Sequence, residues 1–207
     1  MTSGLPVSLV DTNVLVYAYD ASESGKQARA IEVLARLGAC PETRSHALAS
    51  ESQARQGRRE RQYAGILARP RTPHRAGLQP PGRAGAFPDR PLERLGVGAL
   101  SAQVLGEFFR TVTRKIPVPL TTDEAERSVG RYARTWPVHA VSVPAVLEAI
   151  RGVQRYRLSY WDGLIWATAK LNGVPTVLSE DFSDGLLLEG VRFVNPLAPA
   201  FDLASLG

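Results

Sequence analysis

The 207-residue chain has very few of the side chains that bind zinc or form disulfides, with one cysteine, Cys40, and three histidines. A single cysteine excludes an internal disulfide and any metal site built from cysteine. No two of His46, His74 and His139 share a spacing typical of metal ligands. Any metal site must therefore be built from carboxylates, which favour hard cations such as Mg²⁺ or Mn²⁺ over zinc.

Long apolar runs are also missing. The chain has no stretch of about 18 apolar residues and no charged-then-apolar leader after Met1. We therefore expect a soluble cytoplasmic protein without a membrane partner. At 44% hydrophobic residues, residues 1–207 can bury one sizeable core and form a single domain.

Two common enzyme patterns are absent from the sequence. No G-x-G-x-x-G motif follows a predicted strand, which disfavours a dehydrogenase. No nucleophile-elbow pattern accompanies His139, the one histidine outside residues 39–96, which disfavours Ser-His-Asp catalysis.

Short apolar strands alternate with amphipathic helices in two blocks of the chain. We expect strands at 7–10, 97–100, 174–178 and 191–194. The first expected helix follows Asp11 directly, with Thr12 or Asn13 as its cap. The other expected helices begin near Gly25, at 102 with Ser101 as its cap, at the Thr121–Glu124 capping box, at Pro144 and at 160. This alternation predicts an α/β fold with a mostly parallel sheet covered on both sides.

Apolar periodicity indicates which side of two helices faces the core. In helix 102–115 the expected buried residues are Val104, Leu105, Phe108, Phe109 and Val112. In the helix that opens at Pro144 they are Val146, Leu147, Ile150 and Val153.

Residues 39–96 interrupt this pattern. They hold eleven Arg against five Asp or Glu, a net charge of +6, so the rest of the chain carries −1. They also contain seven of the fifteen prolines and no valine, and apolar periodicity is lost. Three interpretations stay open: a poorly packed insertion, a basic RNA-binding arm, and a wrongly framed stretch of a GC-rich gene. We expect the segment to lie outside the sheet.

Three acidic residues come after predicted strands. Asp11 ends the first strand, and Asp181 and Asp184 follow the strand 174–178. Each has a purely structural explanation, because Asp commonly caps helices and forms turns. However, the carboxyl ends of strands in an open α/β sheet are also where ligands and catalytic groups gather.

Two further acids lie near the starts of helices. Glu107 follows Ser101 by six residues and could simply pair with Arg110. Asp162, in the first turn of its helix, could simply offset the helix dipole. If the carboxylates meet at one edge of the sheet, they repel one another, and a divalent cation is the simplest relief. Such a site suits phosphate-ester chemistry.

Four motifs in this order resemble the PIN-domain nucleases, and most closely the VapC-type toxin ribonucleases of bacterial toxin–antitoxin pairs. They are V-D-T-N-V-L-V-Y-A-Y-D, L-S-A-Q-V-L-G-E-F-F, L-S-Y-W-D-G-L-I-W-A-T-A and L-S-E-D-F-S-D-G. The resemblance covers 7–38 and 97–196, including V-R-F-V-N-P near the end. The segment at 39–96 departs from it, because this family usually has a short connection there.

The resemblance implies a three-layer α/β/α sandwich with four or five central strands. It also implies an Mg²⁺- or Mn²⁺-dependent endoribonuclease that leaves 5′-phosphate and 3′-hydroxyl ends, a cognate antitoxin and a homodimer. By the matched positions, the metal-binding and catalytic acids are Asp11, Glu107, Asp162 and Asp181. Asp184 matches an auxiliary acid, and Asn13 and Ser101 match polar residues of the same site.

Two alternatives from other classes stay open. The first is a non-catalytic PIN-like protein that binds RNA or an antitoxin and is inactivated by residues 39–96. The second is a phosphatase-like enzyme acting through Asp11, which is weakened because Asn13 stands where such an enzyme would have a second acid.

Overall fold

The computed structural model describes residues 7–39, 41 and 98–206. Nearly all of the segment at 39–96, with Cys40, His46 and His74, lies outside these residues, so the expectations about it stay predictions. In the described part of the chain, no helix is both long and apolar enough to span a membrane.

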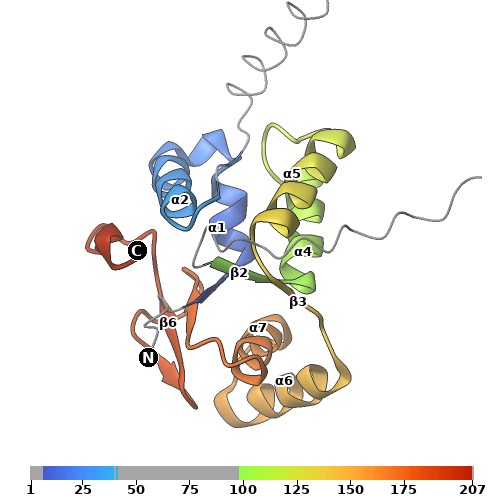
Figure 1. The fold of residues 1–207 in the computed structure, drawn as a ribbon, viewed down its shortest axis with the longest axis vertical. Helices are drawn as coiled ribbons and strands as arrows, with labels where there is room; N and C mark the ends of the chain where they lie inside the picture. Colours follow the sequence, from blue (N-terminus) through green and yellow to red (C-terminus); the bar gives the residue numbers. More distant parts are fainter. Residues whose placement is uncertain (1–6, 40, 42–97, 207) are drawn as a thin grey trace, which may run out of the picture. The chain divides into compact units, whose positions relative to one another are not determined.

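The fold is α/β, built on a six-stranded sheet with the order β3-β2-β1-β4-β6-β5 (Figure 1). The strands are β1 Ser8–Val10, β2 Gly98–Ser101, β3 Val138–His139, β4 Thr176–Leu178, β5 Leu187–Leu188 and β6 Val191–Val194. All neighbouring pairs are parallel except β5 with β6. The expected mostly parallel sheet is confirmed, with two additional strands, β3 and β5, of two residues each.

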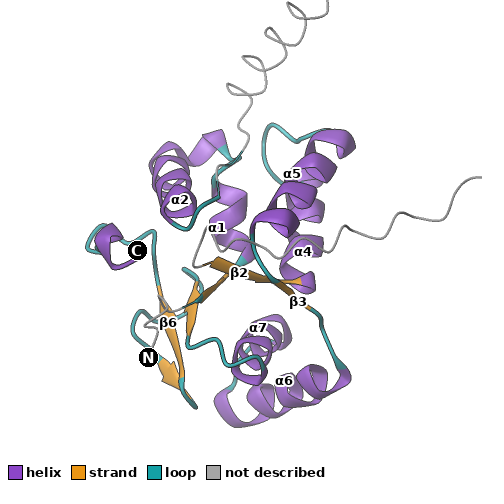
Figure 2. Ribbon diagram, in the orientation of Figure 1, coloured by secondary structure: helices purple, strands orange, loops and turns teal. Residues whose placement is uncertain are grey.

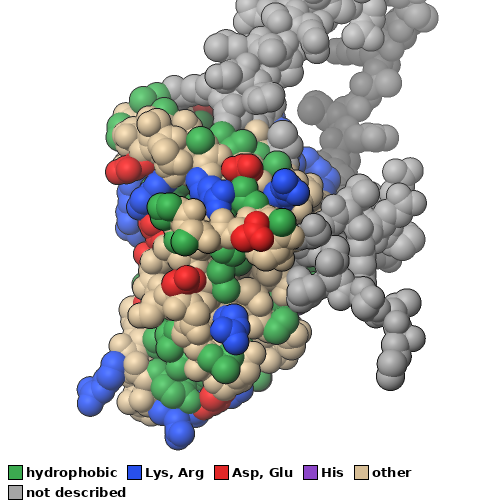
Figure 3. Space-filling model, turned by 90° about the vertical axis from the view of Figure 1, so that its left-hand side faces the viewer, with side chains coloured by type: hydrophobic (Ala, Val, Ile, Leu, Met, Phe, Trp, Pro, Cys, Tyr) green, Lys and Arg blue, Asp and Glu red, His purple; other side chains and the backbone are tan. Residues whose placement is uncertain are grey.

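Helices cover both faces of the sheet (Figures 1 and 2). On one side lie α1 Thr12–Tyr17, α2 Ser24–Arg36, α4 Ala102–Arg114 and α5 Thr122–Thr135, and on the other α6 Val143–Tyr156 and α7 Tyr160–Leu171. Short 3₁₀ helices occur at Ala21–Glu23 and Leu203–Leu206. Figure 3 shows one face of the molecule, on which acidic, basic and hydrophobic side chains are interspersed.

Aromatic side chains link the sheet to the helices above it. Phe108 of α4 contacts the ring of Tyr132 of α5 edge-on, with centroids 5.6 Å apart, and Tyr132 stacks on Trp136. The Trp136 Nε1–H donates a hydrogen bond of 2.8 Å to the Leu37 carbonyl. A Cβ on Gly98 would lie 2.4 Å from the Trp136 ring, so only glycine lets β2 approach this indole.

Side chains at the helix starts satisfy the free backbone N–H groups, as expected. Ser101 caps α4, and Thr121 with Glu124 forms the capping box of α5. The expectation for the first helix is wrong in detail, because Asp11 and not Thr12 or Asn13 is the cap of α1.

The predicted inward face of α6 is wrong at two positions. Leu147 is 62% and Ile150 43% exposed, whereas the small residues of this helix are buried against α7. A Cβ on Gly163 of α7 would come within 2.9 Å of the Ala149 carbonyl oxygen. Because the two backbones lie so close together, the face of α6 that carries small residues packs against α7. The larger apolar residues of α6 therefore point outward. Phe109 of α4, also expected to be buried, is exposed too.

Candidate active site

Two of the predicted acids meet where neighbouring parallel strands end. Asp11 follows β1 and Asp181 follows β4, and these strands pair in parallel from Ser8 to Val10. Asn13 joins the acids, because its Nδ2 donates to Asp181 Oδ2 at 3.1 Å and to Asp11 Oδ2 at 3.3 Å. The backbone N–H of Thr12 donates to Asp11 Oδ1 at 2.6 Å, so Asp11 caps α1 while also facing Asp181.

Glu107 comes to the same place from α4, which follows β2 on the other side of β1. The Thr12 hydroxyl donates a hydrogen bond of 3.0 Å to Glu107 Oε2, and Gln103 Nε2 donates one of 3.3 Å to Oε1. Within the described residues Glu107 forms no ion pair with Arg110, the simpler partnership that the sequence allowed. The helix therefore turns Glu107 toward Asp11.

Asp162 reaches the site from the other layer of helices. It lies in the first turn of α7, where its backbone N–H donates to the capping hydroxyl of Ser159 at 3.1 Å. Asp11, Glu107, Asp162 and Asp181 all line one open cavity of about 1010 Å³. Four acids that are far apart in the sequence thus share one cavity at the carboxyl edge of the sheet.

Burial raises the pKa of Asp11 to about 7. The side chain is only 9% exposed, and the negative charges of Asp181 and Glu107 act in the same direction. Hydrogen bonds from the Ser179 hydroxyl and the Thr12 N–H oppose the shift. A carboxylate buried beside two others is where a bound cation would relieve the most repulsion.

The atoms around Asp11 suit a hard cation by type. Besides carboxylates, two buried amide oxygens of the cavity wall, Asn13 Oδ1 and Gln103 Oε1, have no hydrogen-bond partner among the described residues. Oxygen donors of this kind are the ligands of Mg²⁺ and Mn²⁺. As the side chains stand, no three acidic, histidine or cysteine residues in the described ranges are grouped tightly enough to hold one ion. Metal binding therefore stays a prediction.

Two residues expected at the site do not line the cavity. Ser101 is fully buried, and its Oγ accepts the Val104 N–H at 3.2 Å as the cap of α4. Asp184 accepts the Asn195 N–H at 2.9 Å and does not line the cavity. In the described structure both side chains support the backbone, and neither joins the four acids.

Three polar residues that hold the acids were not identified from the sequence. Thr12 and Gln103 hydrogen-bond to Glu107, and Ser179 hydrogen-bonds to Asp11. Their positions carried a usable signal. Thr12 follows Asp11 directly, Ser179 directly follows β4, and Gln103 lies one helical turn before Glu107.

A second polar cluster fixes the turn between Ser179 and Asp181. Lys26 Nζ lies 2.8 Å from Glu180 Oε2, and the Tyr17 hydroxyl donates to Glu180 Oε1. The pKa of Lys26 is raised by its hydrogen bonds to Glu180 and Tyr17. This cluster ties α1 and α2 to the turn that carries Asp181.

Comparisons with known proteins add little. No protein-family model and no curated protein matches the chain. One similar solved structure is that of Mycobacterium tuberculosis VapC20, described as a toxin that cleaves the sarcin-ricin loop. It is 15% identical, with a TM-score of 0.39, and the match covers 82% of this chain and 85% of that chain. Because this identity and this TM-score are low, the proposed function rests on this chain's own residues.

Proposed function

We propose that this chain is a PIN-type, Mg²⁺- or Mn²⁺-dependent endoribonuclease and the toxin of a toxin–antitoxin pair. One observation carries the proposal: Asp11, Glu107, Asp162 and Asp181 line a single cavity at the carboxyl edge of the sheet. The order of the four motifs along the chain, which resembles the PIN-domain nucleases, supports it.

Asp11, Asp162 and Asp181 would hold the cation, with Glu107 as a further ligand or as the base that orients water. When bound, the ion would neutralise the charge of a phosphodiester and act as a Lewis acid. The chain itself supplies the positioning. Thr12 N–H and the Ser179 hydroxyl fix both oxygens of Asp11, and Thr12 Oγ1 fixes one oxygen of Glu107. Glu107 can then accept a proton from water attacking the phosphorus atom.

A non-catalytic RNA- or antitoxin-binding protein is the second candidate. It is favoured by the spacing of the acids, because no three of them in the described residues are grouped closely enough for one ion. Under the first proposal, a divalent ion draws these side chains together when it binds. Under the second, the ion binds weakly and no cleavage follows.

A cleavage assay separates the two candidates. Purified protein is incubated with single-stranded RNA in EDTA, and then with Mg²⁺ or Mn²⁺ in excess. The nuclease proposal expects cleavage only with the metal, with 5′-phosphate ends on the products. RNA binding without cleavage in either metal would support the non-catalytic protein, and full cleavage in EDTA would contradict the metal mechanism.

The antitoxin partner and the homodimer follow from the same proposal. If the chain is a toxin, its expression should arrest the growth of the host cells. Co-expression with the antitoxin, expected to be encoded beside this chain, should relieve that arrest and give a stable complex. Light scattering of the purified protein should give the mass of two chains.

A further inference from the structure

An exposed pair of aromatic rings stands on the cavity wall beside Asp162. Trp161 is 57% exposed, and its ring meets that of Tyr160 edge-on with centroids 5.2 Å apart. Both residues line the same cavity as the four acids. The other two tryptophans of the chain, Trp136 and Trp166, are fully buried. An indole left largely in water in the wall of this cavity needs an explanation, since burial would stabilise it.

The backbone of Trp161 is held in place while its ring is free. Gln103 Nε2 donates to the Trp161 carbonyl oxygen at 3.3 Å and also to Glu107 Oε1 at 3.3 Å. One amide of α4 therefore fixes the start of α7 relative to an acid of the proposed site. The backbone that carries the Trp161 ring is thus fixed next to an acid of the site.

Two cations line another part of the same cavity. Arg110 and Lys115 of the α4 region are exposed and contribute to its wall. In the described part of the chain neither side chain forms an ion pair. A cavity that combines free cations with an exposed aromatic pair matches the chemistry of a nucleic-acid strand, which needs phosphate contacts and a stacking surface.

We propose that Trp161 is a base-stacking residue of this cavity: one unpaired base of the RNA lies on its indole, and phosphates of the same strand are held by Arg110 and Lys115. The inference rests on the proposed ribonuclease function and names residues that bind its substrate. A base within a duplex has both faces covered by its neighbours, so only an unpaired base can stack on the indole. Tyr160 packs edge-on with the indole and limits its movement.

This arrangement has consequences for binding. Every base has a π face, so stacking on Trp161 depends little on the identity of the base. We therefore expect the cavity to distinguish single strands from duplexes more strongly than it distinguishes one base from another. Phosphate contacts by Arg110 and Lys115 make binding depend on salt, with the logarithm of affinity falling by about 0.7 per cation against the logarithm of salt concentration.

Tryptophan fluorescence tests the inference directly, because Trp161 is the exposed indole among the three. The full chain is titrated in EDTA with a short single-stranded oligoribonucleotide, and separately with the same strand in a duplex. The single strand should quench the acrylamide-accessible part of the emission, and the duplex should not. In Trp161→Phe this quenching should disappear while binding, followed by anisotropy of a labelled strand, persists.

Matched variants separate stacking from general apolar contact. Trp161→Leu should weaken single-strand binding about tenfold, the scale of one lost base stack. Phe109→Leu, which changes an exposed aromatic residue outside the cavity, should leave it unchanged. Arg110→Gln and Lys115→Gln should each reduce the salt slope by about 0.7, and Arg114→Gln, outside the cavity on the same helix, should not.

The outcomes distinguish this inference from the proposed function. If wild-type protein cleaves RNA with Mn²⁺ but Trp161→Leu binds and cleaves as well as wild type, the stacking proposal is wrong and the nuclease stands. If single strands quench Trp161 but no metal supports cleavage, the nuclease is wrong and the binding site stands. If acrylamide access falls with protein concentration before RNA is added, a second copy covers Trp161, and the inference is overturned.

Discussion

Ser179 donates a hydrogen bond from Oγ to Asp11 Oδ2 at 2.6 Å, joining the end of β4 to the end of β1. The same hydroxyl oxygen accepts hydrogen bonds of 3.1 Å from Asn13 Nδ2 and from the Asp181 N–H. One buried serine thus contacts two of the proposed ligands and the amide between them. Because its hydrogen bond favours the charged form of Asp11, Ser179 lowers a pKa that burial raises.

Removing this hydroxyl should destabilise the protein. Ser179→Ala takes a buried donor from a buried carboxylate, so we expect the free energy of unfolding at pH 8 to fall by about 1–3 kcal/mol. Urea denaturation followed by circular dichroism measures this change. Ser205→Ala, at an exposed serine that contacts only its own turn, should change it by less than about 0.5 kcal/mol. Equal effects of the two substitutions would show that Ser179 does not organise the site.

Substitution of Asp11 should abolish activity while keeping the fold. Asp11→Asn retains the shape and can still cap α1, but it loses the charge, so we expect RNA cleavage with Mn²⁺ to fall at least ~100-fold. Asp184→Asn is the comparison, because Asp184 holds the Asn195 N–H outside the cavity. It should leave the cleavage rate within about threefold of wild type once folding is matched. A large loss in Asp184→Asn would restore the auxiliary role that the sequence suggested.

Thr12 should act through Glu107. Thr12→Val keeps the volume but removes the 3.0 Å hydrogen bond to Glu107 Oε2, so we expect kcat to fall about five- to tenfold, the scale of one hydrogen bond. Thr12→Ser restores a hydroxyl and should recover most of the rate. An unchanged rate in Thr12→Val would argue against Glu107 as the base.

The parts of this structure that were predictable are those set by local chemistry. Ser101 and the Thr121–Glu124 pair were identified as caps because their side chains satisfy backbone groups only a few residues away. Asp11 and Asp181 were placed together because parallel strands end at the same edge of a sheet.

The predictions are wrong where contacts between distant segments determine the structure. The outward turn of Leu147 follows from the close approach of α6 to Gly163, which periodicity within α6 does not encode. Strands β3 and β5 have two residues each, too few for an alternating pattern. Motif matching placed Ser101 at the site, although the hydroxyl is used by the backbone of its own helix.

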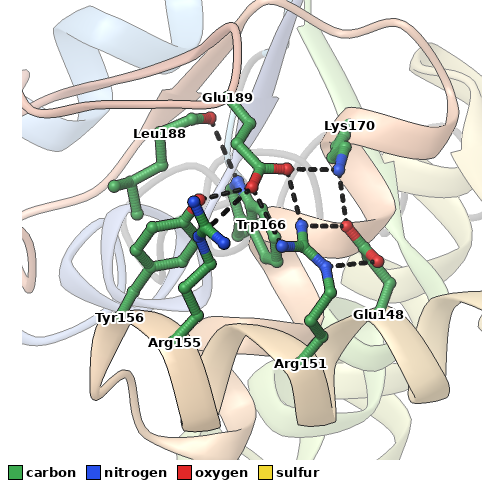
Figure 4. Close-up of polar contacts among 8 residues, drawn as sticks. All are labelled: Glu148, Arg151, Arg155, Tyr156, Trp166, Lys170, Leu188 and Glu189. Atoms are coloured by element: carbon green, nitrogen blue, oxygen red, sulfur yellow. Dashed lines mark hydrogen bonds and ion pairs between the residues drawn. The ribbon is translucent and has the colours of Figure 1, made fainter.

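A charged network outside the cavity lining holds α6, α7 and the turn before β6 together (Figure 4). Glu148 accepts hydrogen bonds from Arg151 at 2.6 Å and from Lys170 at 2.6 Å, and both donors also bond to Glu189. Arg151 and Lys170 in addition lie over the ring of Trp166, each 5.2 Å from its centroid. The network fixes the C-terminal end of α7, the helix whose first turn carries Asp162.

This network should make stability depend on pH in the acid range. Hydrogen bonds from Arg151 and Lys170 lower the pKa of Glu148 from 4.5 to about 2. Between these values the unfolded chain binds the proton and the folded one does not, so the contribution is complete above pH 4.5 and disappears toward pH 2. Glu148→Gln should therefore lose about 1–2 kcal/mol at pH 7, and its deficit against wild type should shrink in urea melts as the pH falls toward 3. Glu126→Gln, at an exposed residue of α5, should have the free energy of unfolding of wild type across this pH range. If the deficit of Glu148→Gln instead stays constant with pH, packing and not charge explains its effect.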